Sequence, residues 1–327
     1  MFERIKTTIN LVHKENPNKS KAYIFFDMVF NVLRYGLSFT DYKKCNFINL
    51  SKSEKQKCLS MSEYRKMIKY LNDEKYDSVF LDKILFNKVF KKYINREFID
   101  LRTCSLDDFI NFIKNKETFF VKKHNSFGGD GVKKIINKNL NYEKLYNELI
   151  SNKQYLVEET IIQHSYLNKI NSKAVNNIRI VTLTKDRNVY IIAKVLRLSD
   201  GIEEVISCHD IMVSLDDEGN FISKAYDDNL VNYQKHPTSN FSFEKGKVPF
   251  MKEMLDMACK AAMEVPEVRF VGWDFTLTEK GPLIIEGNFF PSYGLHQYYL
   301  LNKDYFFKDK LKKILQEEFD NIKKQPL

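Results

Sequence analysis

The feature that most constrains this chain is a predicted β-hairpin at residues 269–291. Four apolar residues alternate with small or polar ones, the period-two pattern of a strand with one apolar face. They are Val271, Trp273, Phe275 and Leu277. The second half of the segment has Leu-Ile-Ile before its polar residues and Phe-Phe-Pro after them. Both strands are therefore expected to be at least half buried.

The turn of this hairpin decides which residues face each other. A three-residue loop, 279–281, is predicted, in which Gly281 adopts the left-handed conformation and forms a bulge. This loop places Asp274 directly opposite Glu286. Asn288 then follows two residues further along the same face.

Two carboxylates in such a position need an explanation, because directly opposed side chains on a sheet have Cβ atoms roughly 5 Å apart and like charges repel. A cation between them removes the repulsion. Asp274, Glu286 and Asn288 offer only oxygen ligands, which suits Mg²⁺ that bridges substrate phosphates. The alternative is a solvated hairpin whose acids point to water, but the apolar flanks favour a metal site.

Composition and cysteine use limit the class of protein. The chain has 327 residues, of which 43% are hydrophobic and 14% aromatic, enough for two or three lobes. Its five cysteines are scattered without a CxxC pair, which indicates reduced thiols rather than a disulfide framework or a zinc site. No apolar run approaches the ~20 residues that span a bilayer, and no signal peptide is evident. A cytoplasmic protein without a transmembrane segment is expected.

The basic charge is concentrated near the N-terminus. The whole chain carries 52 Lys and Arg against 43 Asp and Glu, whereas residues 1–75 carry 15 against 8, a net charge of +7. This excess would suit an anionic partner: phosphates, a membrane surface or an acidic saccharide. The alternative is a lysine-rich helical surface that contacts only solvent.

Helical patterns dominate the first 118 residues. Gly36 is suited to end a helix, and Ser51–Glu54 has the spacing of a capping box. Asp82 is a predicted N-cap. Another helix is expected from Pro249 to Glu264, with proline in its first turn.

A glycine-rich segment follows the helical region. Residues 118–123 and 132–136 have strand patterns, and the loop between them contains Gly128, Gly129 and Gly131. The tip of such a hairpin can fold over phosphates with its backbone N–H groups, although it is not a Walker A motif. A flexible hairpin without a ligand is the alternative. Lys122 is placed to direct a positive charge beneath the loop.

Two acids end the next predicted strand, at residues 154–159. A strand end of this kind can offer backbone groups to an adenine ring and a carboxylate, from Glu158 or Glu159, to a ribose. The alternative is a solvated strand end.

Two arginines lie in otherwise apolar strand patterns, Arg179 in 175–184 and Arg197 in 189–197. An isolated buried guanidinium is costly, so each needs a carboxylate or phosphate partner. A structural salt bridge meets this need. The functional alternative is a clamp on a transferring phosphoryl group.

The order of these parts resembles the ATP-grasp superfamily, and within it the sugar-transfer-associated group linked to polysaccharide and teichuronopeptide synthesis. The resemblance covers about residues 25–325. Its most specific motifs are Asn176-Asn-Ile-Arg-Ile-Val-Thr182, His236-Pro-Thr, and Gly272-Trp-Asp-Phe-Thr-Leu-Thr with Ile-Glu286-Gly-Asn288.

The resemblance implies an α+β fold in which two α+β subdomains grip ATP. The smaller, nucleotide-gripping subdomain is expected at about 76–160, and the larger, metal- and substrate-binding subdomain at 161–327. A mainly helical region, 1–75, precedes this ATP-grasp domain. One departure is Lys123, where many relatives have proline, which leaves the bend of that strand open.

The resemblance also implies roles for individual residues. Those expected at the nucleotide are Lys83 and Lys122 at the phosphates, Gly128, Gly129 and Gly131 in the lid, and Glu158 and Glu159 at the adenine hinge. The expected ligands of two Mg²⁺ ions are Asp274, Glu286 and Asn288. The expected catalytic cations are Arg179, Arg197 and Lys194, and the candidate substrate contacts are His236 and Gln297.

The implied chemistry is amide formation. ATP transfers its γ-phosphate to a carboxylate, an amine attacks the resulting acyl phosphate, and phosphate leaves. The partners are then a carboxylate and an amine, one of them carried by a cell-surface saccharide, its precursor or a nucleotide-sugar, with no nucleic acid. One alternative is a ligase that makes a peptide or another small amide. A second is a non-catalytic nucleotide- or polyanion-binding protein that uses the basic N-terminal region.

Overall fold

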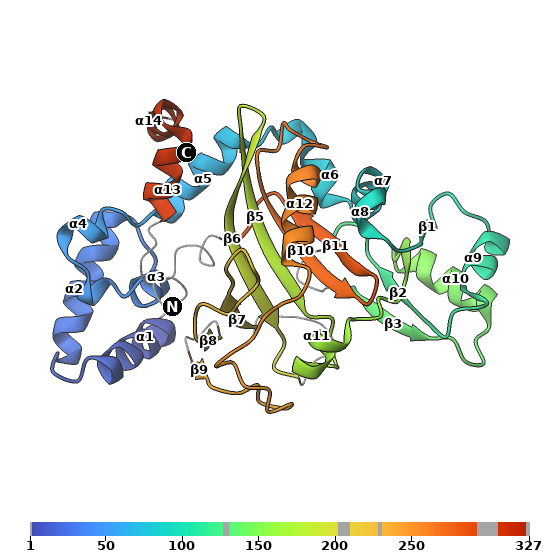
Figure 1. Cartoon of the computed structure of the whole chain (residues 1–327), viewed down its shortest axis with the longest axis horizontal. Coiled ribbons are helices and arrows are strands. Elements are labelled where there is room, and N and C mark those ends of the chain that lie inside the picture. Colours follow the sequence, from blue (N-terminus) through green and yellow to red (C-terminus); the bar gives the residue numbers. More distant parts are fainter. Residues whose placement is uncertain (1, 127–130, 202–209, 228–230, 293–306, 325–327) are drawn as a thin grey trace.

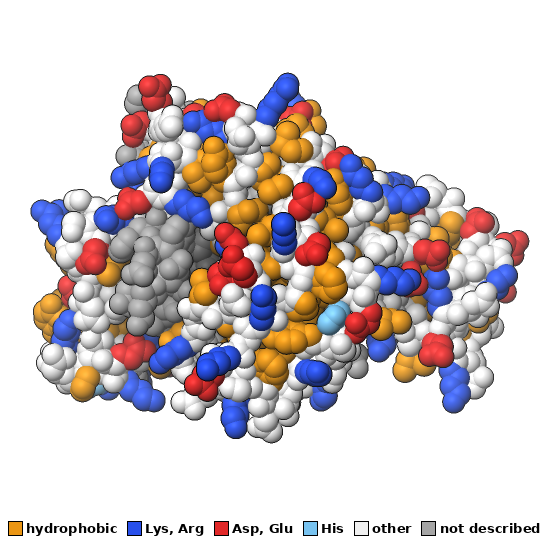
Figure 2. All heavy atoms as spheres, in the orientation of Figure 1, with side chains coloured by type: hydrophobic (Ala, Val, Ile, Leu, Met, Phe, Trp, Pro, Cys, Tyr) orange, Lys and Arg blue, Asp and Glu red, His pale blue; other side chains and the backbone are white. Residues whose placement is uncertain are grey.

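A computed structural model describes residues 2–126, 131–201, 210–227, 231–292 and 307–324 (Figure 1). These residues form helices and two antiparallel sheets. One sheet has the strand order β1-β4-β2-β3 and the other has the order β11-β10-β5-β6-β7-β8-β9. Charged side chains of both signs are interspersed over the face of the molecule shown in Figure 2.

Short helices make up the chain before the first strand. They are α1 (Phe2–Glu15), α2 (Lys21–Tyr35), α3 (Phe39–Lys44), η1 (Phe47–Asn49), α4 (Lys52–Lys55), α5 (Met61–Leu71), η2 (Glu74–Tyr76), α6 (Asp77–Leu81), α7 (Lys83–Val89) and α8 (Lys91–Ile94). Three predicted helix ends are confirmed. Gly36 ends α2 with a φ of 68°, Ser51 and Glu54 form the capping box of α4, and the carboxylate of Asp82 accepts hydrogen bonds from the first turn of α7.

The smaller sheet contains β1 (Phe98–Asp100), β2 (Thr118–Lys122), β3 (Lys133–Ile136) and β4 (Leu156–Glu159). The predicted pairing of the strands on either side of the glycine-rich loop is confirmed, since β2 and β3 are antiparallel neighbours. Helices α9 (Leu106–Ile113) and α10 (Tyr142–Ser151) pack on this sheet through a cluster of buried apolar residues that includes Phe109, Phe119 and Leu149.

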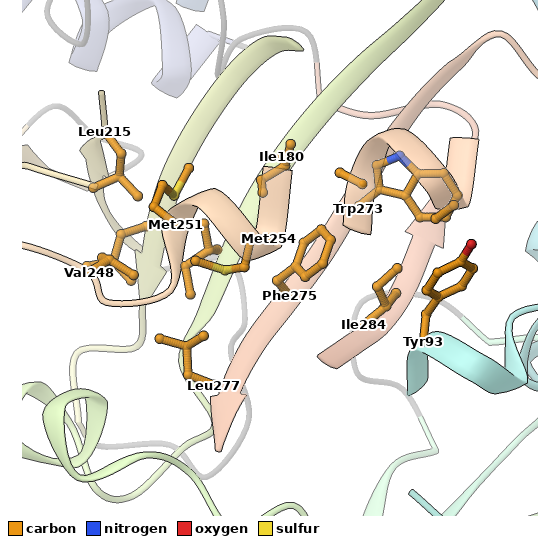
Figure 3. Packing of buried hydrophobic residues seen from close by; sticks show 14 of the residues in the cluster. Tyr93, Ile180, Leu215, Val248, Met251, Met254, Trp273, Phe275, Leu277 and Ile284 are labelled. Atoms are coloured by element: carbon orange, nitrogen blue, oxygen red, sulfur yellow. The ribbon is translucent and has the colours of Figure 1, made fainter. Parts of the chain in front are cut away.

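The larger sheet carries most of the core. Its strands are β5 (Asn177–Lys185), β6 (Asn188–Leu198), β7 (Ile211–Ser214), β8 (Ala225–Tyr226), β9 (Asn232–Tyr233), β10 (Phe270–Thr278) and β11 (Gly281–Asn288), and α11 (Ser165–Ile170) precedes them. Helix α12 (Met251–Ala262) covers one face, where Met254 packs with Ile180 and Phe275 (Figure 3). The predicted start of this helix at Pro249 is wrong: Phe250 takes a left-handed φ of 58° and Met251 is the first helical residue.

Helices also cover the opposite face of the larger sheet. The N-terminal helices α1–α3 pack on Val195 and Met212, whereas α5, α13 (Phe307–Leu315) and α14 (Glu317–Lys324) pack on Val181. Val195 pairs with Arg179 across β5 and β6, so these helices flank the same face that carries Arg179. No helix within the described ranges is both long and apolar enough to cross a bilayer.

The register of the β10–β11 hairpin corrects the predicted turn. Thr278 pairs with Gly281, so the loop contains two residues, 279–280, rather than three. Gly281 has the expected positive φ, 118°, but it belongs to the strand. The bulge predicted at Gly281 is absent, because the strands pair without a shift from Thr278 to Phe275.

A bulge further along restores the predicted carboxylate pair. Phe275 pairs with Ile284 and Asp274 pairs with Glu286, which leaves Ile285 as an extra residue on β11. Without this bulge, a two-residue loop would place Ile285 opposite Asp274. The pairing of the two acids therefore depends on the bulge and not on the turn.

Candidate active site

A cavity of about 150 Å³ lies where the two sheets meet. Residues of α6, α7, β2, β4 and β11 line it together with Ser126: Phe80, Lys83, Phe86, Asn87, Lys122, Ser126, Leu156, Glu158, Ile285, Glu286, Gly287 and Asn288. The structure therefore brings together five predicted site residues from four separate segments: Lys83, Lys122, Glu158, Glu286 and Asn288.

Two lysines form the cationic side of the cavity. Lys83 is the first residue of α7, and its ammonium group donates to the carbonyl of Ser126. Burial lowers the pKa of Lys83, and the nearby Glu286 carboxylate acts in the opposite direction. Lys122 ends β2, and its Nζ lies 2.5 Å from a carboxylate oxygen of Glu158. Ammonium groups at a partly desolvated cavity wall are suited to bind phosphates.

Glu158 is a buried acid on this side of the cavity that binds three neighbouring side chains. Its side chain is buried and accepts hydrogen bonds from Asn87 at 2.6 Å and Arg96 at 2.9 Å, besides its ion pair with Lys122. Burial alone would raise the pKa of Glu158, but Arg96 and then Lys122 outweigh it and hold that pKa well below the usual range. The ribose contact expected of Glu158 stays a prediction.

The second acid of this strand end, Glu159, is placed differently. It does not line the cavity, and its carboxylate accepts a hydrogen bond from the backbone N–H of Glu97 at 3.2 Å. Any contact of Glu159 with adenine or ribose is likewise a prediction that this geometry leaves open.

Glu286 and Asn288 line the other side of the cavity, whereas Asp274 is buried and is not one of the lining residues. Asp274 and Glu286 are cross-strand neighbours, and Asn288 pairs with Gly272 two residues along the same face. Burial and the charge of Asp274 raise the pKa of Glu286. Burial would also raise the pKa of Asp274, but the Arg179 guanidinium outweighs it and lowers that pKa.

The chemistry of these donors fits Mg²⁺. Within the described part of the chain, no three His, Cys, Asp or Glu residues converge as a metal-type cluster. The candidate donors are instead the carboxylates of Asp274 and Glu286 and the amide oxygen of Asn288. An all-oxygen set of this kind suits a hard cation whose remaining ligands are phosphate oxygens and water. A cation there would also relieve the repulsion that raises the pKa of Glu286.

Both predicted arginines converge on Asp274. Arg179, which is 4% exposed, forms a two-point ion pair with Asp274, with Nη2 at 2.7 Å from Oδ2. Arg197 pairs with Asp210, and its Nη1 lies 3.8 Å from Asp274. The salt bridges considered from the sequence are therefore present, and they orient two guanidinium groups on the face that carries the acidic pair.

A glycine makes room for Arg179. A Cβ atom on Gly272 would lie 3.2 Å from Cδ of Arg179 and 2.7 Å from Cβ of Pro291. Contacts this short require one of these neighbours to move. Gly272 therefore lets the Arg179 side chain lie flat across β10 towards Asp274.

Other predicted site residues lie elsewhere. Lys194 pairs with Ile180 in the sheet, which places it on the face opposite Arg179, and its ammonium group pairs with Asp217. His236 is fully buried, with Nε2 at 2.8 Å from the Ser199 carbonyl. This burial argues against a direct contact of His236 with substrate.

The remaining predicted residues are Gly128, Gly129, Gly131 and Gln297. Gly128, Gly129 and Gln297 lie outside the described residues. Gly131 is described and has a φ of 69°, and a Cβ atom there would lie 2.8 Å from the side chain of Lys123. The lid role of the glycines and the substrate role of Gln297 stay predictions.

One buried residue of the site, Arg96, has no sequence signal. Its guanidinium is 3% exposed and donates to Glu158, to the carbonyl of Ile284 at 2.8 Å and to that of Ile285 at 3.0 Å. Arg96 thus ties β4 of the smaller sheet to the bulge of β11 that positions Glu286. These partners lie 62 to 189 positions away in the chain, beyond the reach of any local pattern.

The ATP-grasp class of fold has two sheets with a nucleotide cavity between them. Here that cavity has two lysines on one side and oxygen donors on the other. Residues 64–313 match the family model described as sugar-transfer associated ATP-grasp, and the chain therefore belongs to that family. The predicted α+β ATP-grasp fold with a helical N-terminal region is confirmed. No curated protein sequence matches the chain.

Solved structures of ATP-grasp ligases are similar at low identity. D-alanyl-alanine synthetase A from Vibrio cholerae O1 biovar eltor str. N16961 is 12% identical with a TM-score of 0.45, over 74% of this chain and 66% of that one. VanG D-Ala:D-Ser ligase from Enterococcus faecalis is 15% identical with a TM-score of 0.45, over 72% and 60%. The ATP-grasp ligase PsnB complexed with minimal precursor is 12% identical with a TM-score of 0.42, over 68% and 55%. The matched region is thus less than two thirds of the length of each of these chains.

Proposed function

We propose that this protein is an ATP-dependent ligase that joins a carboxylate to an amine. The observation that carries the proposal is the cavity between the sheets, where Lys83 and Lys122 face the oxygen donors of β11. Cations on one wall suit the phosphates of ATP, and oxygen donors on the other suit a divalent metal ion. Membership of the ATP-grasp family supports the same conclusion.

Each group of side chains has a distinct task in this proposal. Lys83 and Lys122 hold the nucleotide phosphates and offset their charge, because phosphoryl transfer depends on positioning and charge neutralisation. Asp274, Glu286 and Asn288 would hold two Mg²⁺ ions, which would supply positive charge to offset that of the phosphates.

The arginines complete the charge balance on the sheet. Arg179 holds Asp274 in its ionised form and fixes its orientation. Arg197 lies on the same face, next to Asp274, with its guanidinium about one-fifth exposed. In this proposal it approaches the oxygens of a phosphoryl group or an acyl phosphate.

The reaction forms one amide per ATP. An oxygen of the substrate carboxylate forms a bond to the γ-phosphorus as the bond to ADP breaks. The amine nitrogen then bonds to the acyl carbon, phosphate leaves with the bonding electrons, and the amine proton passes to solvent. The protein contributes mainly orientation and electrostatic stabilisation to these steps.

ADP release in the presence of Mg²⁺ and candidate carboxylate and amine pairs tests the proposal. Asp274→Asn and Glu286→Gln are each expected to slow release by about 100-fold or more, since each removes a charge from the metal site. Asp256→Asn is the matched control, because Asp256 is an exposed residue of α12 that pairs with Lys260. Unchanged ADP release in both site variants would show that the metal assignment is wrong.

We further propose that a saccharide or nucleotide-sugar carries one of the reacting groups. The family description, which associates these ATP-grasp proteins with sugar transfer, supports this substrate class. A screen of uronic acids against amino acids and amines tests it. ADP release only with pairs of amino acids would instead favour a peptide-forming ligase.

A further inference from the structure

Helix α2 carries large apolar side chains on two opposite sides. Ile24 and Met28 are fully buried and pack into the cluster beneath the helix. A second group points to solvent along the outer side, at spacings of three and four residues that keep its members in one stripe. This outer stripe consists of Tyr23, Phe26, Phe30 and Leu33, which are 53%, 69%, 57% and 80% exposed.

The outer stripe is not needed to hold the helix in place. Its side chains lie opposite the buried ones, and packing through Ile24 and Met28 already docks α2 against the rest of the N-terminal region. Monomeric proteins seldom expose a contiguous stripe of large aromatic and aliphatic side chains unless the stripe binds something. The outer stripe is therefore a candidate interaction surface.

Helix α2 carries two exposed basic side chains and one acid. Lys21 begins the helix and Arg34 lies in its last turn, and both are exposed. Arg34 lies over the ring of Phe30, with 5.8 Å between the guanidinium carbon and the ring centroid. The one acid in the helix, Asp27, is half-buried and accepts a hydrogen bond from the hydroxyl of Tyr42.

We propose that α2 docks on the surface of a bilayer that contains anionic lipid. The outer stripe would lie at the boundary between headgroups and acyl chains, with Arg34 at the anionic headgroups. An exposed aromatic stripe with a basic side chain beside it is typical of helices that lie in a membrane interface. The net charge of +7 over residues 1–75 complements the negative surface of such a bilayer.

Co-sedimentation of the full chain with vesicles tests this surface. We expect binding to phosphatidylcholine vesicles that contain roughly 30% phosphatidylglycerol, binding that weakens with added salt, and much weaker binding to phosphatidylcholine alone. Phe26→Ser and Phe30→Ser should each weaken binding roughly tenfold. Arg34→Gln should also weaken it roughly fivefold and reduce its dependence on salt.

Two controls separate this surface from general stickiness and from misfolding. Ile162→Ser and Ile222→Ser remove side chains that are 80% and 54% exposed elsewhere in the chain, and both variants should bind vesicles as the unaltered protein does. The thermal midpoint of the stripe variants should stay unchanged, since the substituted side chains make little buried contact.

Several results would overturn the membrane proposal. They are an absence of vesicle binding, equal binding to neutral and anionic vesicles, or loss of binding in the Ile162 and Ile222 variants to the same degree as in the stripe variants. A dimer that dissociates in Phe26→Ser and Phe30→Ser, without vesicle binding, would assign the outer stripe to a second copy of the chain.

Discussion

Replacement of Arg96 by methionine is the sharpest test of how the two sheets are held together. The guanidinium of Arg96 is 3% exposed and contacts Glu158 on β4 and the carbonyls of Ile284 and Ile285 on β11. Methionine fills a similar volume but can make none of these hydrogen bonds. The substitution thus removes the tie between the sheets without opening a large cavity.

The expected loss of stability follows from these contacts. Glu158 keeps Lys122 and Asn87 as partners, so the cost lies near the lower end of the roughly 3–5 kcal/mol for breaking a buried ion pair. Two buried carbonyls that lose a donor add about 1 kcal/mol. We expect Arg96→Met to lower the free energy of unfolding by about 4 kcal/mol. Arg96→Lys should cost about 2 kcal/mol, because an ammonium group keeps the charge but cannot span the three partners.

Urea unfolding followed by Trp273 fluorescence measures this loss. Trp273 is the single tryptophan of the chain and is buried against Phe90 in the main core, so its emission reports on the larger sheet. Arg65→Met is the matched control, because Arg65 is exposed on α5, and it should change the free energy of unfolding by less than about 0.5 kcal/mol. Equal unfolding midpoints for the Arg96 and Arg65 variants would refute the inferred role of Arg96.

Three further predictions concern single contacts. Gly272→Ala should displace Arg179 or Pro291 and slow ADP release by roughly tenfold or more. Gly281→Ala should leave the rate of ADP release unchanged, because a Cβ atom there meets no neighbour; its only cost is strain from the positive φ of residue 281. The pKa of Glu158 is depressed in the folded protein, so its ionised form stabilises the fold above the ordinary glutamate pKa of about 4.3. This stability is lost as the pH falls below that value. Urea titrations between neutral and acid pH should show the loss in the unaltered protein and a smaller loss in Glu158→Gln. Ser60→Ala should cost about 1 kcal/mol in the same unfolding assay, because Ser60 caps α5 in a capping box.

Local patterns in the sequence were sufficient for much of the fold. Alternating apolar residues located β10, and cap residues such as Asp82 located helix ends, because both signals depend only on neighbours within a few positions. The pairing of the strands around the glycine-rich loop was predicted for the same reason. The start of α12 was missed because the left-handed conformation of Phe250 has no signal in an ordinary residue of that type.

The site was only partly accessible from the sequence. The resemblance to ATP-grasp proteins named Lys83, Lys122, Glu158, Glu286 and Asn288, and the structure places all five around one cavity. Family resemblance gives residue types and their order, but not which face of a sheet a side chain occupies.

The hairpin at residues 269–291 shows which features the sequence determines by itself and which require the tertiary structure. Its two strands, their apolar faces and the presence of a carboxylate on each were determined by the sequence alone, because the alternation of side chains is a local property of extended backbone. That Asp274 faces Glu286 was decided by the bulge at Ile285. Arg96 binds that bulge from a distant part of the chain, and a contact of this kind exists only once the tertiary structure has formed.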